Sequence, residues 1–272
     1  MTQNRRRFLA GLAAGATLPL HGLAADRLVL TGSSTIAPLA LEIAKRFEQR
    51  RPGVRVDVQS GGSSRGVADA RKGLAQIGMV SRALNPNESD LVAHTIAKDG
   101  VAVILHKSNT VKSLSDAQVK AIYTGQITDW QALGGPKGTI TVVNKAEGRS
   151  TLELFLHHYG LKPGDIHAQV VIGENQQGIK TVAGNPLAIG YVSIGTAESE
   201  AALGTPIRPL AMNGVEASTA AVRDGRFPLS RPLNLVTFGP VSPLAREFIA
   251  FAQSSAVHDL VKDAFFVPLA GA

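Results

Sequence analysis

The chain has 272 residues, no cysteine and a formal net charge of +7 at pH 7. Hydrophobic residues make up 44% and charged residues 18%, a composition typical of a folded globular protein and not of a disordered one. The absence of cysteine excludes disulfides, thiolate zinc sites, iron–sulfur clusters and a cysteine nucleophile. This length suits one large domain or two domains of about 100–130 residues each.

The first 25 residues, MTQNRRRFLAGLAAGATLPLHGLAA, have the pattern of a secretory signal peptide. Three arginines precede an apolar stretch that is shorter than the roughly 20 residues a spanning helix needs. Arg5-Arg6-Arg7-Phe8-Leu9 fits the twin-arginine export pattern, with an ordinary export signal as the alternative. We therefore expect residues 1–25 to be removed and the product to reside in the periplasm.

Much of the positive charge belongs to this segment. Without its three arginines, 25 basic residues face 21 acidic ones, which leaves a net charge of +4. This small excess, with 5% aromatic residues and no Lys/Arg run, argues against a nucleic-acid partner. It is compatible with a small anionic ligand.

Short apolar strands alternate with amphipathic helices along the rest of the chain. Strands are predicted at 27–31, 54–58, 76–80, 101–106, 139–143, 168–172, 187–192 and 233–238. Helices are predicted at 36–50, 64–73, 85–98, 115–123, 152–159, 178–183, 243–253 and 256–265. This alternation predicts an α/β fold with largely parallel strands. No composition shift marks a linker, so the chain is free to cross between lobes more than once.

Three predicted helices begin in loops rich in glycine and hydroxyl groups, at residues 32–38 (GSSTIAP), 61–66 (GGSSRG) and 148–151 (GRST). A helix N-terminus offers free N–H groups and about half a positive charge to an anion. If the three loops converge, they would enclose a tetrahedral oxyanion. The alternative is that each loop only caps its helix, Ser34 or Thr35 serving as the cap of the first.

Two other chemistries are weighed against anion binding. Residues 62–66 match the G-x-S-x-G nucleophile elbow of α/β-hydrolases, and His258 lies downstream. However, the elbow would follow only the second strand, and no His-Gly-Gly-Gly oxyanion motif is present. His157 and His158 are adjacent on a helix and point about 100° apart. We therefore predict no catalysis, no metal and no cofactor.

The chain resembles the phosphate-binding proteins that serve phosphate-uptake ABC transporters. The matching stretches occur in family order: GSSTIAPL (32–39), GGSSRG (61–66), IGMVSR (77–82), IAKDGVAVILHKSN (96–109), IYTGQITDWQALGG (122–135), NKAEGRSTLELF (144–155), LAIGYVS (187–193) and FPLSRPLNLV (227–236). The resemblance implies a two-lobe periplasmic-binding-protein fold of type II, with mixed sheets flanked by helices and a ligand cleft between lobes. We expect residues 26–100 and 195–272 to form lobe I, and residues 101–194 to form lobe II.

The resemblance also nominates ligand-binding residues. These are Ser34, Thr35, Ser63, Gln76, Ser81, Arg82, Lys145, Arg149, Ser150 and Thr151. We expect Ser34, Thr35 and Ser63 to come from one lobe, and the residues numbered 145–151 from the other. Arg82 is placed either at the rim or as a support of its own loop. Trp130 is expected to pack in the core.

Three positions depart from the family pattern. Gln76 stands where the family usually has Asp, which removes a carboxylate able to accept a hydrogen bond from protonated phosphate. Lys145 stands where the family usually has Arg, and lysine cannot form a planar bidentate clamp. Arg149 replaces a small residue and either reaches the anion or points to solvent.

The function that the resemblance implies is capture of an inorganic oxyanion, phosphate first, and its delivery by a monomer to a membrane ABC permease. The departures leave open another oxyanion, such as sulfate, molybdate or tungstate. A sensor or interaction protein that does not serve transport is the third possibility, and a serine hydrolase is a remote one.

Overall fold

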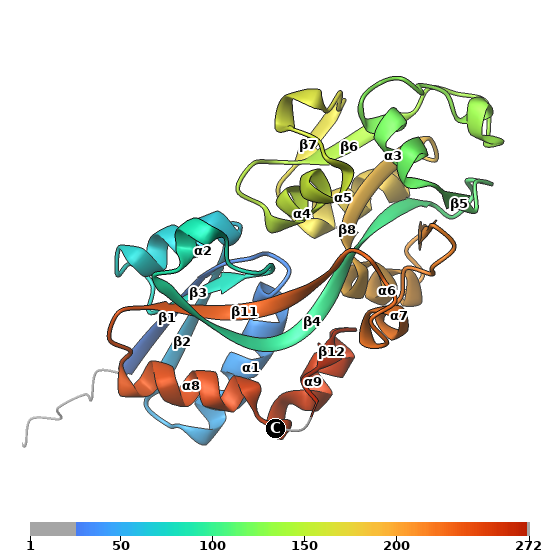
Figure 1. Ribbon diagram of the computed structural model, residues 1–272. Coiled ribbons are helices and arrows are strands. Elements are labelled where there is room, and N and C mark those ends of the chain that lie inside the picture. Colours follow the sequence, from blue (N-terminus) through green and yellow to red (C-terminus); the bar gives the residue numbers. More distant parts are fainter. Residues whose placement is uncertain (1–25, 271–272) are drawn as a thin grey trace, which may run out of the picture.

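A computed structural model describes residues 26–270 of the chain. The predicted signal peptide, residues 1–25, lies outside the described residues. Within the described range, no helix is both long enough and apolar enough to cross a membrane. The chain folds into two α/β lobes joined by the long strands β4 (Leu91–His106) and β11 (Ser230–Phe238) (Figure 1).

One mixed sheet runs through both lobes in the order β2 (Val54–Ser60), β1 (Asp26–Gly32), β3 (Ile77–Val80), β11, β4, β8 (Ala188–Ser193), β6 (Thr141–Lys145) and β7 (Val170–Ile172). Neighbours β1, β2 and β3 are parallel, as are β6, β7 and β8. The crossing strands β4 and β11 are antiparallel to each other and to the strands beside them. The predicted α/β class is therefore confirmed, with antiparallel strands at the junction of the lobes.

Lobe I is built from both ends of the described chain. Its elements are β1 (Asp26–Gly32), α1 (Ala37–Arg50), β2 (Val54–Ser60), α2 (Ser63–Arg71), β3 (Ile77–Val80), α8 (Pro243–Gln253), α9 (His258–Asp263) and β12 (Val267–Pro268). Leu28 and Leu30 of β1 pack into one core with Phe47 of α1 and Phe248 of α8. The other sheet face is covered by α2, whose Val67 packs with residues of β3 and β11. Side-chain alternation along the strands thus gives the sheet a helix layer on each face.

Lobe II contains the middle of the chain. Its elements are β5 (Ser113–Leu114), α3 (Asp116–Tyr123), β6 (Thr141–Lys145), α4 (Ser150–Tyr159), β7 (Val170–Ile172), α5 (Asn175–Gly184), β8 (Ala188–Ser193), α6 (Ile194–Ala202), β9 (Ile207–Pro209), β10 (Ala211–Met212) and α7 (Thr219–Arg223). Short 3₁₀ turns lie at Pro86–Glu88, Trp130–Leu133, Pro163–Asp165 and Ser255–Val257. Val103 and Leu105 of β4 enter one core of the lobe, while Ile104 between them enters the other. Trp130 is fully buried in the first core, as predicted.

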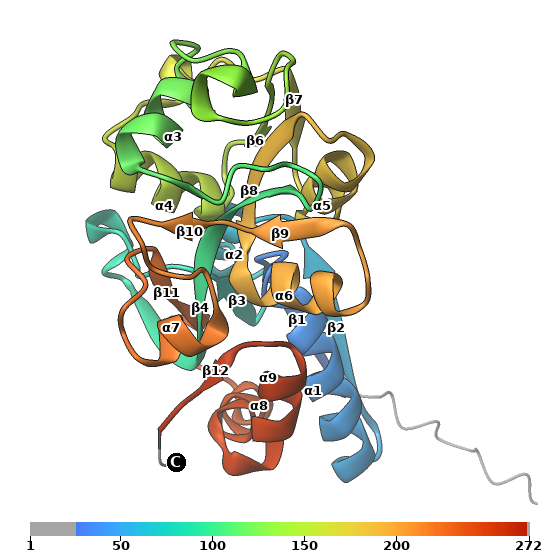
Figure 2. The same cartoon turned by 90° about the vertical axis from the view of Figure 1, so that its right-hand side faces the viewer.

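Two sequence expectations need correction. The helix predicted over residues 85–98 is wrong: a 3₁₀ turn ends at Glu88 and strand β4 begins at Leu91. The reason is tertiary, because residues 91–100 pair with β11 along its whole length. The expected return to lobe I at residue 195 also differs from the packing. Strand β9 pairs with residues 104–106, and Ala221 and Leu229 belong to a lobe II core, so the chain returns to lobe I with β11 (Figure 2).

The packing of the lobe I core predicts how a core substitution changes the free energy of unfolding. Leu30 has no exposed surface, whereas Leu74 is 64% exposed. We expect Leu30→Ala to lower the free energy of unfolding by about 2–5 kcal/mol, because it removes buried methyl groups and leaves a cavity. The matched control Leu74→Ala should change it by less than about 0.5 kcal/mol. Urea unfolding of both variants measures the difference, and equal values would contradict the described packing.

Candidate functional site: a hydroxyl-lined pocket between the lobes

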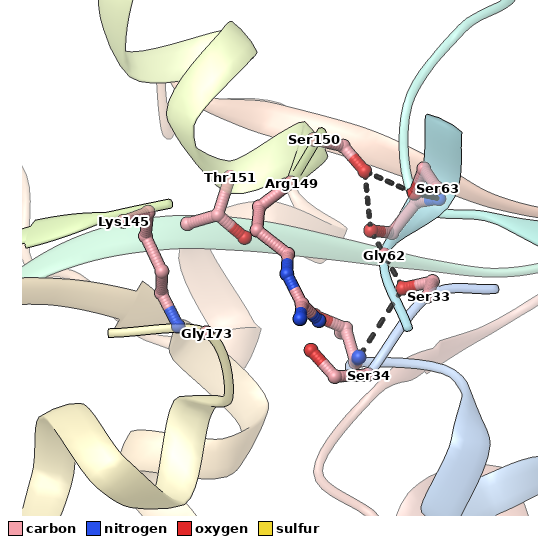
Figure 3. Close-up of a pocket in the computed structure, with 11 residues that line it drawn as sticks. Ser33, Ser34, Gly62, Ser63, Lys145, Arg149, Ser150, Thr151 and Gly173 are labelled. Carbon is pink, nitrogen blue, oxygen red and sulfur yellow. Dashed lines mark hydrogen bonds between the residues drawn. The ribbon is translucent and has the colours of Figure 1, made fainter. Parts of the chain in front are cut away.

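The three glycine- and hydroxyl-rich loops converge on one pocket between the lobes (Figure 3). Its lining residues are Ser33, Ser34, Thr35, Gly62, Ser63, Ser81, Lys145, Arg149, Ser150, Thr151 and Gly173. The free space inside is only about 10 Å³, close to the minimum that holds one water molecule, so the lobes are closed tightly on this pocket. Most of the lining is buried; Ser63, Ser81 and Ser150 are each at most 2% exposed.

The loop that follows β1 is fixed by a close approach of backbones. Gly32 has φ +133°, and a Cβ there would lie 2.3 Å from the carbonyl oxygen of Met79, so only glycine fits. The Ser33 hydroxyl then accepts hydrogen bonds from the N–H groups of Thr35 and Ile36, at 3.2 and 3.4 Å. Ser33 therefore holds the turn that leads into α1, whose N-cap is Ile36 without a side-chain hydrogen bond. The sequence suggestion that Ser34 or Thr35 caps this helix is wrong. Those two hydroxyls are left to face the pocket.

The other two loops meet each other across the cleft. Gly62 has φ +97°, and a Cβ there would lie 2.7 Å from the carbonyl oxygen of Gly148 in lobe II. That same carbonyl accepts a hydrogen bond from the N–H of Ser64 at 3.2 Å. The N-termini of α2 and α4 are thereby held face to face, and the structure is that of a closed cleft.

A chain of serine hydroxyls joins the lobes. Ser33 Oγ donates to Ser81 Oγ at 2.9 Å, and Ser81 Oγ is 2.9 Å from Ser150 Oγ. Ser150 Oγ also shares a short hydrogen bond with Ser63 Oγ (Figure 3). Hydroxyl groups both donate and accept, so these serines can bond to one another or turn their donors toward an anion.

Arg231 lies behind the pocket and organises its hydroxyls. Its guanidinium donates to Thr35 and Thr151 at 3.1 Å each and to Ser81 at 3.4 Å. The same group forms a buried ion pair with Asp99 at 2.8 Å, and both side chains are 1% exposed. Asp99 and Arg231 come from the two crossing strands, so this pair links the sheet to hydroxyls of both lobes.

Lys145 ends β6 and points into the site (Figure 3). It is 2% exposed, and its Nζ donates to Asn175 Oδ1 at 2.9 Å. Asn175 Nδ2 in turn donates to Thr35 Oγ1 at 3.2 Å. Burial, followed by the nearby charge of Arg231, lowers the pKa of Lys145 from 10.5 to about 7.

Arg149 lines the pocket, and its side chain is 17% exposed, so it does not extend into solvent. Its side chain passes Gly62 and Gly173, where an added Cβ would come within 3.0 and 2.9 Å of the arginine. Its Nη1 forms an ion pair with Glu174 at 2.8 Å. The replacement of a small residue by Arg149 thus adds a cation to the pocket wall.

The structure does not bring Gln76 and Arg82 into this group. Gln76 is an exposed residue before β3, and its Oε1 accepts from the N–H of Val29 at 2.8 Å. Arg82 is buried but turns to carboxylates, with Glu88 at 2.6 Å and Glu153 of lobe II at 2.5 Å. Arg82 is therefore a bridge between the lobes and not part of the pocket wall.

Sequence reasoning missed Ser33, Asp99, Asn175 and Arg231. The available signal was a charged residue inside an otherwise apolar strand: Asp99 precedes the run GVAVIL, and Arg231 precedes PLNLV. A charge in such a position is buried and needs a partner. The two charges are 132 residues apart, and only the fold shows that they pair.

The pocket chemistry favours an anion. Two cationic side chains, three helix starts and several hydroxyls line it, and no Asp or Glu of the described residues does. Residues 26–270 contain no cluster of His, Cys, Asp or Glu able to hold a metal. The G-x-S-x-G serine, Ser64, donates to Glu153 at 3.2 Å, and no described histidine lines the pocket.

A family model described as PBP superfamily domain matches residues 20–256. The chain belongs to the PBP superfamily. A curated relative, the phosphate-binding protein PstS of Bacillus subtilis, is 28% identical over 251 residues, covering 90% of this chain and 82% of its own length. The family resemblance seen in the sequence is thereby confirmed.

Two solved structures agree with this membership. One is described as a phosphate ABC transporter substrate-binding protein with bound phosphate from Clostridium perfringens; it has a TM-score of 0.84 and 30% identity, covering 90% of this chain and all of its own. The other is an ABC-type phosphate transport receptor from Vibrio cholerae, with a TM-score of 0.74 and 28% identity over 89% of this chain and all of its own. The predicted type II two-lobe fold is confirmed by these neighbours.

The buried ion pair makes a prediction that does not depend on ligand. We expect Asp99→Asn to lower the free energy of unfolding by about 3–5 kcal/mol, because it leaves the buried Arg231 charge without its partner. The control Asp57→Asn breaks the pair with Arg27, which is 66% exposed, and should cost less than about 1 kcal/mol. Denaturant unfolding without added anion compares them. Similar losses would show that the Asp99 pair does not hold the crossing strands.

Proposed function

We propose that this chain is an exported solute-binding protein that captures an inorganic oxyanion, phosphate first, and passes it to a membrane ABC permease. The observation that carries the proposal is the compact pocket itself. Helix starts, hydroxyls and cations converge there without a carboxylate. The relatives support phosphate, since those from Bacillus subtilis, Clostridium perfringens and Vibrio cholerae are all described as phosphate-binding or phosphate-transport proteins.

The binding donors come from both lobes. Ser34, Thr35 and Ser63 would hold the anion from lobe I, while Ser150 and Thr151 would hold it from lobe II, together with Lys145 and Arg149. The serine chain described above exchanges its mutual hydrogen bonds for bonds to the anion. Because hydroxyls also accept hydrogen bonds, they can accept the hydrogen bond that a protonated phosphate donates, since no carboxylate lines the pocket to do so.

Closure couples binding to transport. An open form admits the hydrated anion, and contacts between the two lobes form only when the cleft shuts, which excludes water from the site. Glu153 of α4 supplies two of these contacts, with Arg82 and with Ser64. A permease that recognises the closed surface would accept only the loaded protein. No catalytic step is part of this proposal, and the mature protein is expected to act as a periplasmic monomer.

A second candidate is a receptor for a different oxyanion such as sulfate, molybdate or tungstate. The specific observation in its favour is that no described carboxylate faces the pocket while Lys145 and Arg149 do. Such a wall repels no fully ionised dianion. A sensor or interaction protein would use the same fold without needing an intact pocket.

The experiment is isothermal titration calorimetry of the ligand-stripped mature protein with phosphate, sulfate, arsenate, molybdate and tungstate at pH 7.5. We expect saturable 1:1 binding of phosphate. If sulfate or a metal oxyanion binds more tightly than phosphate, that anion is the ligand of this protein and the assignment of phosphate is wrong. No heat with any of the five anions would contradict the receptor function.

Thr151→Val tests the site itself. The hydroxyl of Thr151 lies in the pocket beside Arg231, and valine keeps the shape of the side chain while removing the donor. The loss of one hydrogen bond to a charged ligand should raise the Kd about tenfold. The control Thr181→Val removes a hydroxyl that bonds only to the Gln177 carbonyl of its own helix. The Kd of this control should stay within about twofold of the wild-type value. Equal effects of both variants would show that Thr151 does not bind the anion.

Glu153→Gln tests closure. Glutamine keeps the size of the side chain but removes the charge that pairs with Arg82 across the cleft. We expect the Kd for phosphate to rise about fivefold, since the closed form loses an interaction of about 1 kcal/mol that the open form does not make. The control Asp116→Asn breaks a pair with His158 inside lobe II and should leave the Kd unchanged. Small-angle scattering with saturating phosphate should show a larger open fraction only for Glu153→Gln.

A further inference from the structure

The cations of this site are not equally neutralised. Arg231 pairs with Asp99 at 2.8 Å, and Arg149 pairs with Glu174 at 2.8 Å. Lys145 has no carboxylate within ion-pair distance among the described residues, and its one acceptor is the neutral amide oxygen of Asn175. It is nonetheless buried at 2% exposure. An ammonium in this position has lost most of its hydration without gaining a counter-ion.

The groups around Lys145 explain why no side chain serves as the counter-ion of its ammonium group. The charges that act on it are Arg231 of β11, Arg149 at the start of α4 and Glu174 at the start of α5. Both arginines repel the ammonium, and Glu174 is already engaged by Arg149. The Tyr191 hydroxyl accepts from the backbone N–H of Lys145 at 3.3 Å and stays neutral, because burial raises the pKa of Tyr191.

We propose that Lys145 is the group that takes up a proton when the oxyanion enters, so that ligand binding at this pocket is coupled to protonation of the lysine. The inference rests on the proposed function, since the oxyanion is the counter-ion that the site otherwise lacks. In the unliganded closed pocket the lysine loses its proton near neutral pH. A bound anion stabilises the ammonium and holds the proton to higher pH.

The sign of the effect follows from linkage. The pKa of Lys145 is about 7 in the closed pocket without ligand and is higher with the anion bound, so the complex binds more protons than the empty closed protein at pH above 7. Affinity is therefore full below pH 7 and falls as pH rises, by about tenfold per pH unit once the free lysine is mostly neutral. An arginine at position 145 would stay charged over this whole pH range, so the affinity would no longer depend on the protonation of this residue.

Lys145→Arg is the matched variant. The Kd for inorganic phosphate is measured by calorimetry from pH 6 to pH 9 for both proteins, and the ratio of the two Kd values cancels the titration of phosphate itself. We expect the ratio of wild type to Lys145→Arg to rise about tenfold between pH 7.5 and 8.5. Titration in buffers of different ionisation enthalpy should show about one more proton taken up by the wild type at pH 8. A constant ratio, with equal proton uptake, overturns the inference.

A second measurement covers the case in which Lys145→Arg does not fold. Carbon NMR of the lysine side chains in the wild type, assigned with Lys145→Gln, follows the Cε shift of Lys145 during a pH titration. We expect a midpoint near neutral pH without phosphate and a midpoint above pH 9 with it. Equal midpoints overturn the proton coupling while phosphate binding stands, whereas the absence of phosphate binding at every pH overturns the proposed function instead.

Discussion

The buried pair of Asp99 and Arg231 is the interaction on which the site depends. The two residues lie opposite each other on the strands that connect the lobes, in register within the β4–β11 ladder. A guanidinium held by a carboxylate has a fixed plane, and its remaining N–H groups point in fixed directions. Those directions are toward hydroxyls of Thr35, Ser81 and Thr151, which belong to different segments and both lobes. The position of the two strands in the sheet thus fixes, through this pair, where the hydroxyls of the pocket lie.

Close backbone approach is the second constraint. The helix starts of α2 and α4 meet because Gly62 places no side chain against the Gly148 carbonyl, and a hydrogen bond from Ser64 N–H to that carbonyl joins the loops at 3.2 Å. Two positive helix ends facing each other repel, so negative charge between them makes their approach more favourable. The same geometry that closes the cleft therefore selects an anion, and affinity and closure are one free-energy change.

The sequence predicted the local elements well where their cause is local. Helices such as Ala37–Arg50 and Pro243–Gln253 have an apolar stripe of helical period, and both lie within about one residue of the predicted ranges. The segment after Asn85 failed because Asn85-Pro86 starts a turn that stops at Glu88, and pairing with β11 then makes the following residues a strand. Propensity gave way to tertiary pairing there.

For the site, too, the sequence predicted the local motifs and missed the contacts between distant segments. Hydroxyl residues next to glycine at helix starts can be recognised in the sequence, and the three loops that contain them do meet in the pocket. Gln76 was placed from the family pattern alone, and the structure puts it just before β3, where it bonds to Val29 of β1. Asp99 and Arg231 escaped because pairing across 132 residues has no local signature. Contacts between distant segments thus account for what the sequence did not reveal.

The placement of carboxylates explains how the site stays folded without ligand and still attracts an anion. Asp99 and Glu174 each pair with an arginine, and neither is among the residues that line the pocket. They offset the repulsion among the cations in the empty state, yet neither carboxylate lines the pocket. Lys145 is the exception, with only a neutral amide as acceptor. A pocket with every cation paired would bind an anion weakly, and one with none paired would be unstable when empty. One buried lysine that can release its proton meets both conditions.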